Sequence, residues 1–270
     1  MMKARQITLT FAAVCSIAHA AVHSGKAEAA WISRSRTYEA GKPIQMAIRL
    51  TIDPGWHSYW LNPGEGGMKT TVKWDLPNGW TAGELENPIP SRFQGGGLAS
   101  FGYKGTVIFP VKLNPPADAK GPVNLKADVS WLACDDQACV PGKAEPSIML
   151  DNGGPSITPE AQLIAQALTT IPRAQKEWGP LELEEKNGQL VLGIPVDPTK
   201  PHDLSVTPEI FPATPGVINA DQKVRLTFDG LKWTGTVPKS EYAKEQIREL
   251  SLVVAGQSGQ QPILLHWKID

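Results

Sequence analysis

The sequence predicts an all-β protein of two immunoglobulin-like β-sandwich domains joined by a linker with a short helix. Short segments alternate between apolar and polar residues along the chain, which is the period of a half-buried strand. The 25 Gly and 24 Pro residues supply turns between them and disfavour long helices. At least seven such strands in the first half are typical of a sandwich. The predicted units are a signal peptide at 1–29, β-sandwiches at 31–152 and 173–270, and a linker with the helix at 153–172.

The N-terminus has the pattern of a secretory signal peptide. Lys3 and Arg5 precede an apolar run from Ile7 to about Val22, and A-x-A patterns follow at 18–20 and 27–29. We expect cleavage after Ala29 or somewhat earlier, and export to the bacterial periplasm, where disulfides are permitted. The alternative is an uncleaved anchor, although the run is short for a membrane span.

The first predicted domain opens with regular alternation. Every second side chain of residues 46–52 is apolar, as in a strand with one buried face. Trp56 and Trp60 share one face of the next strand and fit a sandwich core. Alternation turns Tyr59 to the opposite face, toward the cysteine pair described below.

Residues 86–100 have no periodicity and contain two prolines and three consecutive glycines. We expect a long mobile loop here, with a large apolar residue at each end, Phe93 and Phe101. A loop of this length in a compact domain is usually functional or disordered. Phe93 is therefore either an ordinary loop anchor or part of a lid.

Two of the three cysteines, Cys134 and Cys139, belong at the tip of a predicted β-hairpin. Residues 127–132 alternate as a strand, and Pro141-Gly142 marks a turn. A hairpin tip lacks the helix dipole that lowers a thiol pKa, and the neighbouring Asp135 and Asp136 disfavour a thiolate. We expect a passive carrier, attacked or reduced by a partner.

Three interpretations of the pair remain open. A structural disulfide closing about six residues would stabilise the fold by only about 2 kcal/mol. A zinc site would need two more ligands, and His57, His202 and His266 form no ligand doublet near the pair. A redox-active dithiol fits the close spacing and the export signal.

The second half reads as a linker followed by another all-β unit. Residues 151–158 are rich in Gly, Pro and Ser, and apolar residues at 163–171 lie on one face of a short helix. Strands return after Trp178. We find neither a cysteine nor a catalytic constellation in this half.

Several separated motifs resemble one known family. The run WLACDDQACVPG at 131–142 resembles the cysteine hairpin of the N-terminal periplasmic domain of DsbD, the thiol:disulfide interchange protein. The runs at 55–64, 72–80 and 101–111 are similar to ScsB-type relatives. The resemblance covers roughly residues 31–152 and implies thiol–disulfide interchange activity.

The resemblance also implies residue roles. Cys139 would attack a partner disulfide, and Cys134 would resolve the mixed disulfide. Phe93 matches a cap-loop phenylalanine that covers the pair until a partner displaces it. Arg92 stands where the family carries an acidic residue and would favour a thiolate. Tyr59 and Tyr103 are further candidates to line the site.

The implied partners are periplasmic thioredoxin-like or disulfide isomerase proteins and a membrane-embedded electron-transfer protein. No metal, flavin or other cofactor is implied. The balance of 26 basic and 27 acidic residues gives no nucleic-acid footprint. A rival interpretation is a non-catalytic periplasmic binding module in which the cysteines form a static clip.

Overall fold

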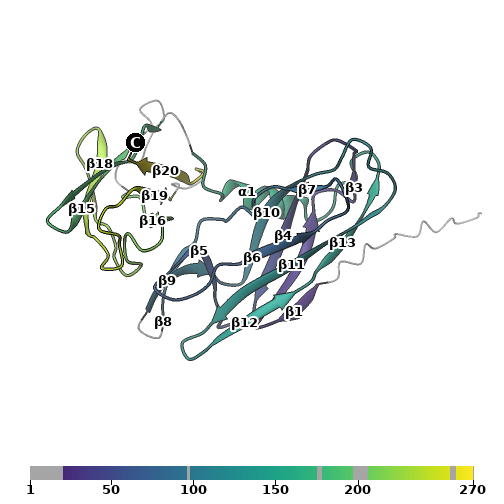
Figure 1. Ribbon diagram of the computed structural model, residues 1–270, viewed down its shortest axis with the longest axis horizontal. Coiled ribbons are helices and arrows are strands. Elements are labelled where there is room, and N and C mark those ends of the chain that lie inside the picture. Colours follow the sequence, from purple (N-terminus) through teal and green to yellow (C-terminus); the bar gives the residue numbers. More distant parts are fainter. Residues whose placement is uncertain (1–20, 96–97, 175–177, 197–205, 256–259, 270) are drawn as a thin grey trace, which may run out of the picture.

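A computed structural model describes residues 21–95, 98–174, 178–196, 206–255 and 260–269. Two lobes built from β-sheets lie on either side of one helix, and the prediction of an all-β chain with a short linking helix is confirmed (Figure 1). In the described part of the chain, no helix has both the length and the apolar character of a membrane span.

Three sheets form the first lobe, with strand orders β1-β2-β4-β10-β7, β12-β11-β13-β3 and β5-β9-β8, and β6 also pairs with β11. The strands are β1 Val22–Ser24, β2 Ala27–Ser33, β3 Thr37–Tyr38, β4 Ile44–Ile52, β5 Ser58–Gly64, β6 Thr71–Asp75, β7 Thr81–Ala82, β8 Ser91–Gly95, β9 Leu98–Tyr103, β10 Thr106–Asn114, β11 Val123–Cys134, β12 Cys139–Ala144 and β13 Ser147–Asn152.

Two sheets form the second lobe, ordered β14-β15-β18-β17 and β16-β19-β20. Their strands are β14 Glu182–Lys186, β15 Gln189–Pro195, β16 Ile210–Pro212, β17 Leu226–Phe228, β18 Lys232–Pro238, β19 Glu249–Val254 and β20 Ile263–Lys268. The helix α1, Ala161–Thr169, buries Ile164 against Ile32, Ala47 and Ile108 of the first lobe. It therefore covers the outer face of the first sheet.

Alternation accounts for the core of the first lobe. Met46, Ile48 and Leu50 of β4 are fully buried, as their shared face predicts. Trp31, Trp60 and Trp131 are also fully buried and supply large apolar side chains from three different sheets. Burial on this scale supports the lobe without help from a disulfide.

The signal peptide predicted at 1–29 overlaps the first two strands. β1 and the first half of β2 lie within the stretch assigned to the signal, and Ala27 and Ala29 are fully buried. β2 pairs with β4 along its whole length. The physical reason is that Ala27-Glu28-Ala29 satisfies the A-x-A pattern and is also the apolar–polar–apolar alternation of a strand.

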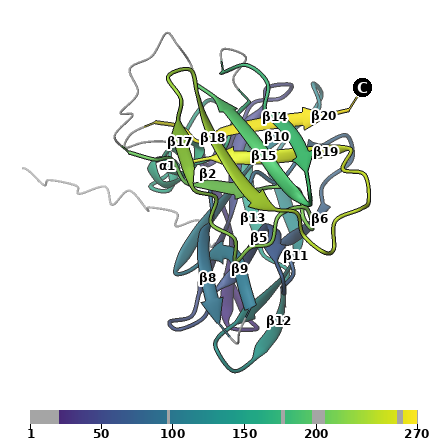
Figure 2. The ribbon, with the colours of Figure 1, turned by 90° about the vertical axis from the view of Figure 1, so that its left-hand side faces the viewer.

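The expected long loop at 86–100 is also wrong, because most of it is a β-hairpin. β8 pairs with β9 from Ser91–Gly102 to Gly95–Leu98, and Gly96 and Gly97 lie outside the described residues. Strands β8 and β9 and the connection between β11 and β12 lie at the same end of the first lobe (Figures 1 and 2).

Candidate functional site

Strand pairing places the two cysteines directly opposite each other. Cys134 ends β11 and Cys139 begins β12, with their Cα atoms 4.1 Å apart and a disulfide between them. The N–H and C=O groups of Cys134 bond instead to His57 on the other side, each at 2.9 Å. The cysteines are thus a non-hydrogen-bonded cross-strand pair, the kind whose side chains lie closest.

The turn between the cysteines is held by Asp135. Its backbone N–H bonds to the carbonyl of Ala138 at 3.0 Å. Its carboxylate accepts hydrogen bonds from the N–H groups of Gln137 and Ala138 at 2.8 and 2.7 Å. These bonds lower the pKa of Asp135. Asp135 is therefore a turn-forming residue, so its charge is engaged with the backbone of the loop.

The two half-cystines differ sharply in exposure. Cys134 is 2 % exposed, whereas Cys139 is exposed. Both line a cavity of about 260 Å³, whose other lining residues include His57, Tyr59 and Leu98. Cys139 is therefore the member of the pair that solvent reaches, and Cys134 is the buried one.

His57 connects the pair to Phe93. The ring of His57 stacks on Phe93, with 5.0 Å between centroids, and lies edge-on to Tyr59 at 5.2 Å. The ammonium group of Lys104 lies over the ring of Phe93, with Nζ 4.9 Å from the ring centroid. Phe93 itself is outside the set of residues that line the cysteine cavity. It contacts the site through His57.

Arg92 does not lie beside the cysteines but points toward the second lobe. Alternation along β8 turns Arg92 to the opposite face from Phe93. Its guanidinium donates to the carbonyls of Ala220 and Ile210, both at 2.7 Å, and pairs with Glu209 at 3.0 Å. Burial lowers the pKa of Arg92, and the bond to Glu209 opposes that shift. This arginine joins the two lobes.

The two candidate tyrosines lie in different places. Tyr59 lines the cysteine cavity, as alternation predicts, and burial raises the pKa of its hydroxyl. Tyr103 instead lies in the core, where it donates to the carbonyl of Pro88 at 2.8 Å and packs against Phe109. Burial raises the pKa of Tyr103 strongly. The expectation that Tyr103 lines the site is wrong.

Leu98 and His57 are among the lining residues that the sequence did not single out for the site. Leu98 is 50 % exposed at the end of the hairpin turn, a place hidden by the loop interpretation. His57 was considered only as a zinc ligand. Among the described residues, no group of three or more His, Cys, Asp or Glu side chains could hold a metal ion.

His57 gives the site a pH dependence. Burial and the positive charge of Lys104 lower its pKa, and Asp136 and Asp135 oppose this more weakly. The unfolded chain therefore binds the proton at a higher pH than the folded chain, so stability falls as the pH drops below about 6.5. We expect His57→Gln to lose less stability than the wild type between about pH 7 and 5. Urea unfolding at both pH values measures this, and equal losses in the two proteins would contradict it.

Residues 27–150 match the family model described as "Thiol:disulfide interchange protein DsbD, N-terminal". The chain is similar in structure to the N-terminal periplasmic domain of ScsB from Proteus mirabilis, with a TM-score of 0.64 and 21 % sequence identity. That match covers 90 % of this chain and 93 % of the other, so the fold similarity extends over both lobes. No curated protein matches.

Proposed function

Residues 27–150 of the chain belong to the DsbD N-terminal family, and from this premise we propose that the protein is a periplasmic thiol–disulfide exchange protein. It passes reducing equivalents through the Cys134–Cys139 pair to or from partner proteins. The observation that carries the proposal is the disulfide with one exposed and one buried cysteine, at the wall of an open cavity. A clip that served only stability would need no accessible sulfur.

Exchange proceeds through a mixed disulfide. A thiolate of the partner attacks Sγ of Cys139, which breaks the bond to Cys134 and leaves Cys134 as the departing thiolate. A second partner thiolate then attacks the partner's own sulfur in the mixed disulfide and releases Cys139. The chain gains two electrons and two protons, and the partner leaves as a disulfide. The reverse sequence oxidises the chain.

Phe93 shields the sulfurs indirectly, because it contacts His57 and not the cysteines. Its ring covers His57, whose backbone holds Cys134 in place through two hydrogen bonds. A partner that approaches the cavity must contact this stacked pair or displace it. The shield is partial, because Cys139 itself stays exposed.

The expected partners are thioredoxin-like or disulfide isomerase proteins of the periplasm, together with a membrane-embedded protein that exchanges electrons with them. The similar ScsB domain is described as periplasmic, which supports the compartment. An export signal ending at Ala18-His19-Ala20 would leave β1 and β2 intact, because both begin after it.

We therefore expect export to leave Ala21 as the first residue of the mature protein. Mass spectrometry of the protein recovered from the periplasm would measure the N-terminus. A chain beginning at Ala30 would contradict this, since it would lack β1 and the buried Ala27 and Ala29 of β2.

Equilibration with glutathione buffers tests the proposed function. The free thiols of Cys134 and Cys139 are counted after acid quenching at a series of ratios of reduced to oxidised glutathione. We expect a potential above about −300 mV, which marks labile disulfides. A pair that stays oxidised at more reducing potentials would support the static clip and a non-catalytic binding module instead.

A further inference from the structure

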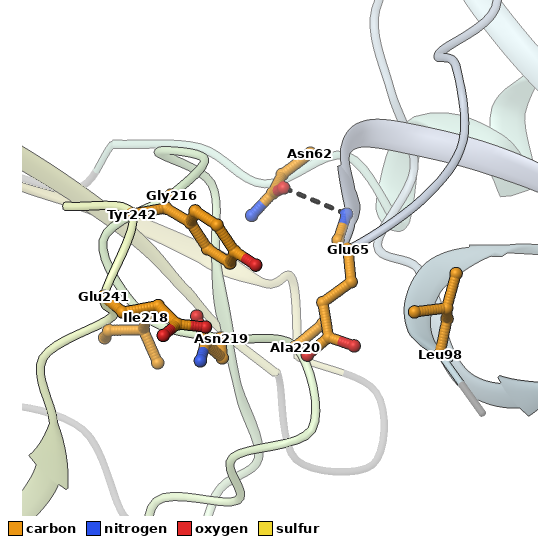
Figure 3. A pocket seen from close by; sticks show the side chains of 10 residues that line it. Asn62, Glu65, Leu98, Gly216, Ile218, Asn219, Ala220, Glu241 and Tyr242 are labelled. Atoms are coloured by element: carbon orange, nitrogen blue, oxygen red, sulfur yellow. Dashed lines mark hydrogen bonds between the residues drawn. The ribbon is translucent and has the colours of Figure 1, made fainter.

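A second cavity, of about 500 Å³, lies where the two lobes meet. The first lobe contributes Asn62, Gly64, Glu65 and Leu98. The second lobe contributes Gly216, Ile218, Asn219 and Ala220 together with Glu241 and Tyr242 (Figure 3). Its location gives the second lobe, which has no cysteine, a place near the exchange site.

The two cavities share a wall. Leu98 lines both of them. The chain also passes from one to the other without a break, because Gly64 and Glu65 line the inter-lobe cavity and Gly66 and Gly67 line the cysteine cavity. A polypeptide bound at the disulfide can therefore extend over Leu98 into the inter-lobe cavity.

Two glycines on this shared stretch allow close packing. A Cβ on Gly64 would lie 2.9 Å from Cβ of Ala220 and 2.7 Å from the carbonyl oxygen of Ala99. A Cβ on Gly67 would lie 2.2 Å from the ring of Tyr59. Both residues also have positive φ, 86° and 135°. The floor that links the cavities is thus fixed against both lobes.

The linings of the inter-lobe cavity and the cysteine cavity together carry a negative charge. Its linings include Glu65, Glu241, Asp135 and Asp136, and no Lys or Arg is among them. Glu65 uses one carboxylate oxygen to accept the N–H of Ala99 at 3.2 Å. Glu241 also lines the inter-lobe cavity and makes no ion pair with any residue in the described ranges.

We propose that the inter-lobe cavity binds a lysine- or arginine-bearing segment of the exchange partner, next to the partner's reactive cysteine. The proposal rests on the proposed exchange function. The carboxylates of Glu65 and Glu241 meet the cation. The exposed ring of Tyr242 offers a face to the same charge. Leu98 meets an apolar residue between the cation and the cysteine.

Peptides with a single cysteine test the proposal, with that cysteine carried as a mixed disulfide with thionitrobenzoate. Matched peptides place Lys, Gln or Glu about two to six residues from the cysteine, since an extended chain spans ~3.3 Å per residue. The reduced full-length protein attacks the peptide sulfur and releases thionitrobenzoate, whose absorbance gives the rate. Cys134 and Cys139 then close to a disulfide and release the peptide thiol, so two electrons pass from protein to peptide disulfide.

We expect the best Lys peptide to react about fivefold faster than its Gln counterpart and the Glu peptide to react slowest. Raised salt should shrink the difference. Glu65→Gln, which keeps an acceptor for Ala99, and Glu241→Gln should each reduce the Lys preference. Glu184→Gln, on the exposed edge strand β14, should retain it.

Equal rates for the three peptides would overturn the proposal. So would a Lys preference that survives Glu65→Gln and Glu241→Gln but disappears in Asp136→Asn, because that would assign it to the cysteine loop alone. A control reaction distinguishes failure of the docking proposal from failure of the exchange function. In it, reduced wild-type protein reacts with the symmetric disulfide of thionitrobenzoate, which carries no peptide. If that reaction is also absent, the exchange function fails, and the docking role fails with it.

Discussion

Replacing Cys139 with alanine is expected to abolish thiol–disulfide exchange, whereas replacing Cys134 with alanine is expected to trap a mixed disulfide. Cys139 is the exposed member of the pair, so its loss removes the sulfur that a partner can reach. Without Cys134, an adduct on Cys139 has no resolving thiol and persists. Mass spectrometry after incubation with glutathione disulfide would measure the adduct on each variant.

The two variants are matched controls for stability. Each loses the same short disulfide loop, worth about 2 kcal/mol, so both should unfold at similar urea concentrations. A difference in adduct formation between them then reports on chemistry. If Cys139→Ala formed adducts through Cys134 as quickly as Cys134→Ala does through Cys139, the assigned roles would be wrong.

The second large effect is expected at the junction of the lobes. Phe211 of β16 is 3 % exposed and packs edge-on against Trp60 and Phe101 of the first lobe, with ring centroids 6.4 and 5.8 Å apart. Arg92 lies over both Phe101 and Phe211. Phe211→Ala should lower the free energy of unfolding by about 3–5 kcal/mol, because it opens a cavity inside the core of the first lobe.

Urea unfolding monitored by tryptophan fluorescence measures that loss. Phe228→Ala is the matched control, because Phe228 is only half-buried within the second lobe and packs on Trp233. Its cost should be smaller. A loss below about 1 kcal/mol for Phe211→Ala would mean that the lobes do not share a core. Combining Phe211→Ala with Arg92→Ala should give less than the sum of the two effects, since the side chains are in contact.

The cysteine hairpin could be predicted from the sequence because its signals are local. Alternation in residues 127–132 predicts the first strand, and the four residues between the cysteines place Cys134 opposite Cys139. The turn expected at Pro141-Gly142 is wrong, because both residues lie within β12 and pair with Leu132 and Trp131. The exposure difference between the cysteines could not be predicted this way. Cys134 pairs through its backbone with His57, which lies just before β5, and only tertiary packing brings that distant residue there.

The β8–β9 hairpin was missed because prolines and glycines outweighed a short alternation. Once residues 91–95 are recognised as a strand, Arg92 and Phe93 must face opposite ways. The loop interpretation instead kept both beside the cysteines. At the N-terminus the predicted signal peptide overlaps β2, because small alanines fit both a cleavage site and a buried strand.

The most direct test of the exchange mechanism is the site of the first covalent bond in the wild-type protein. Oxidised protein is mixed briefly with reduced glutathione, free thiols are blocked in acid, and the tryptic peptide spanning residues 127–143 is fragmented between the cysteines. The mechanism predicts the glutathione adduct on Cys139 and the blocking group on Cys134. An adduct found equally on both cysteines, or on neither, would contradict it.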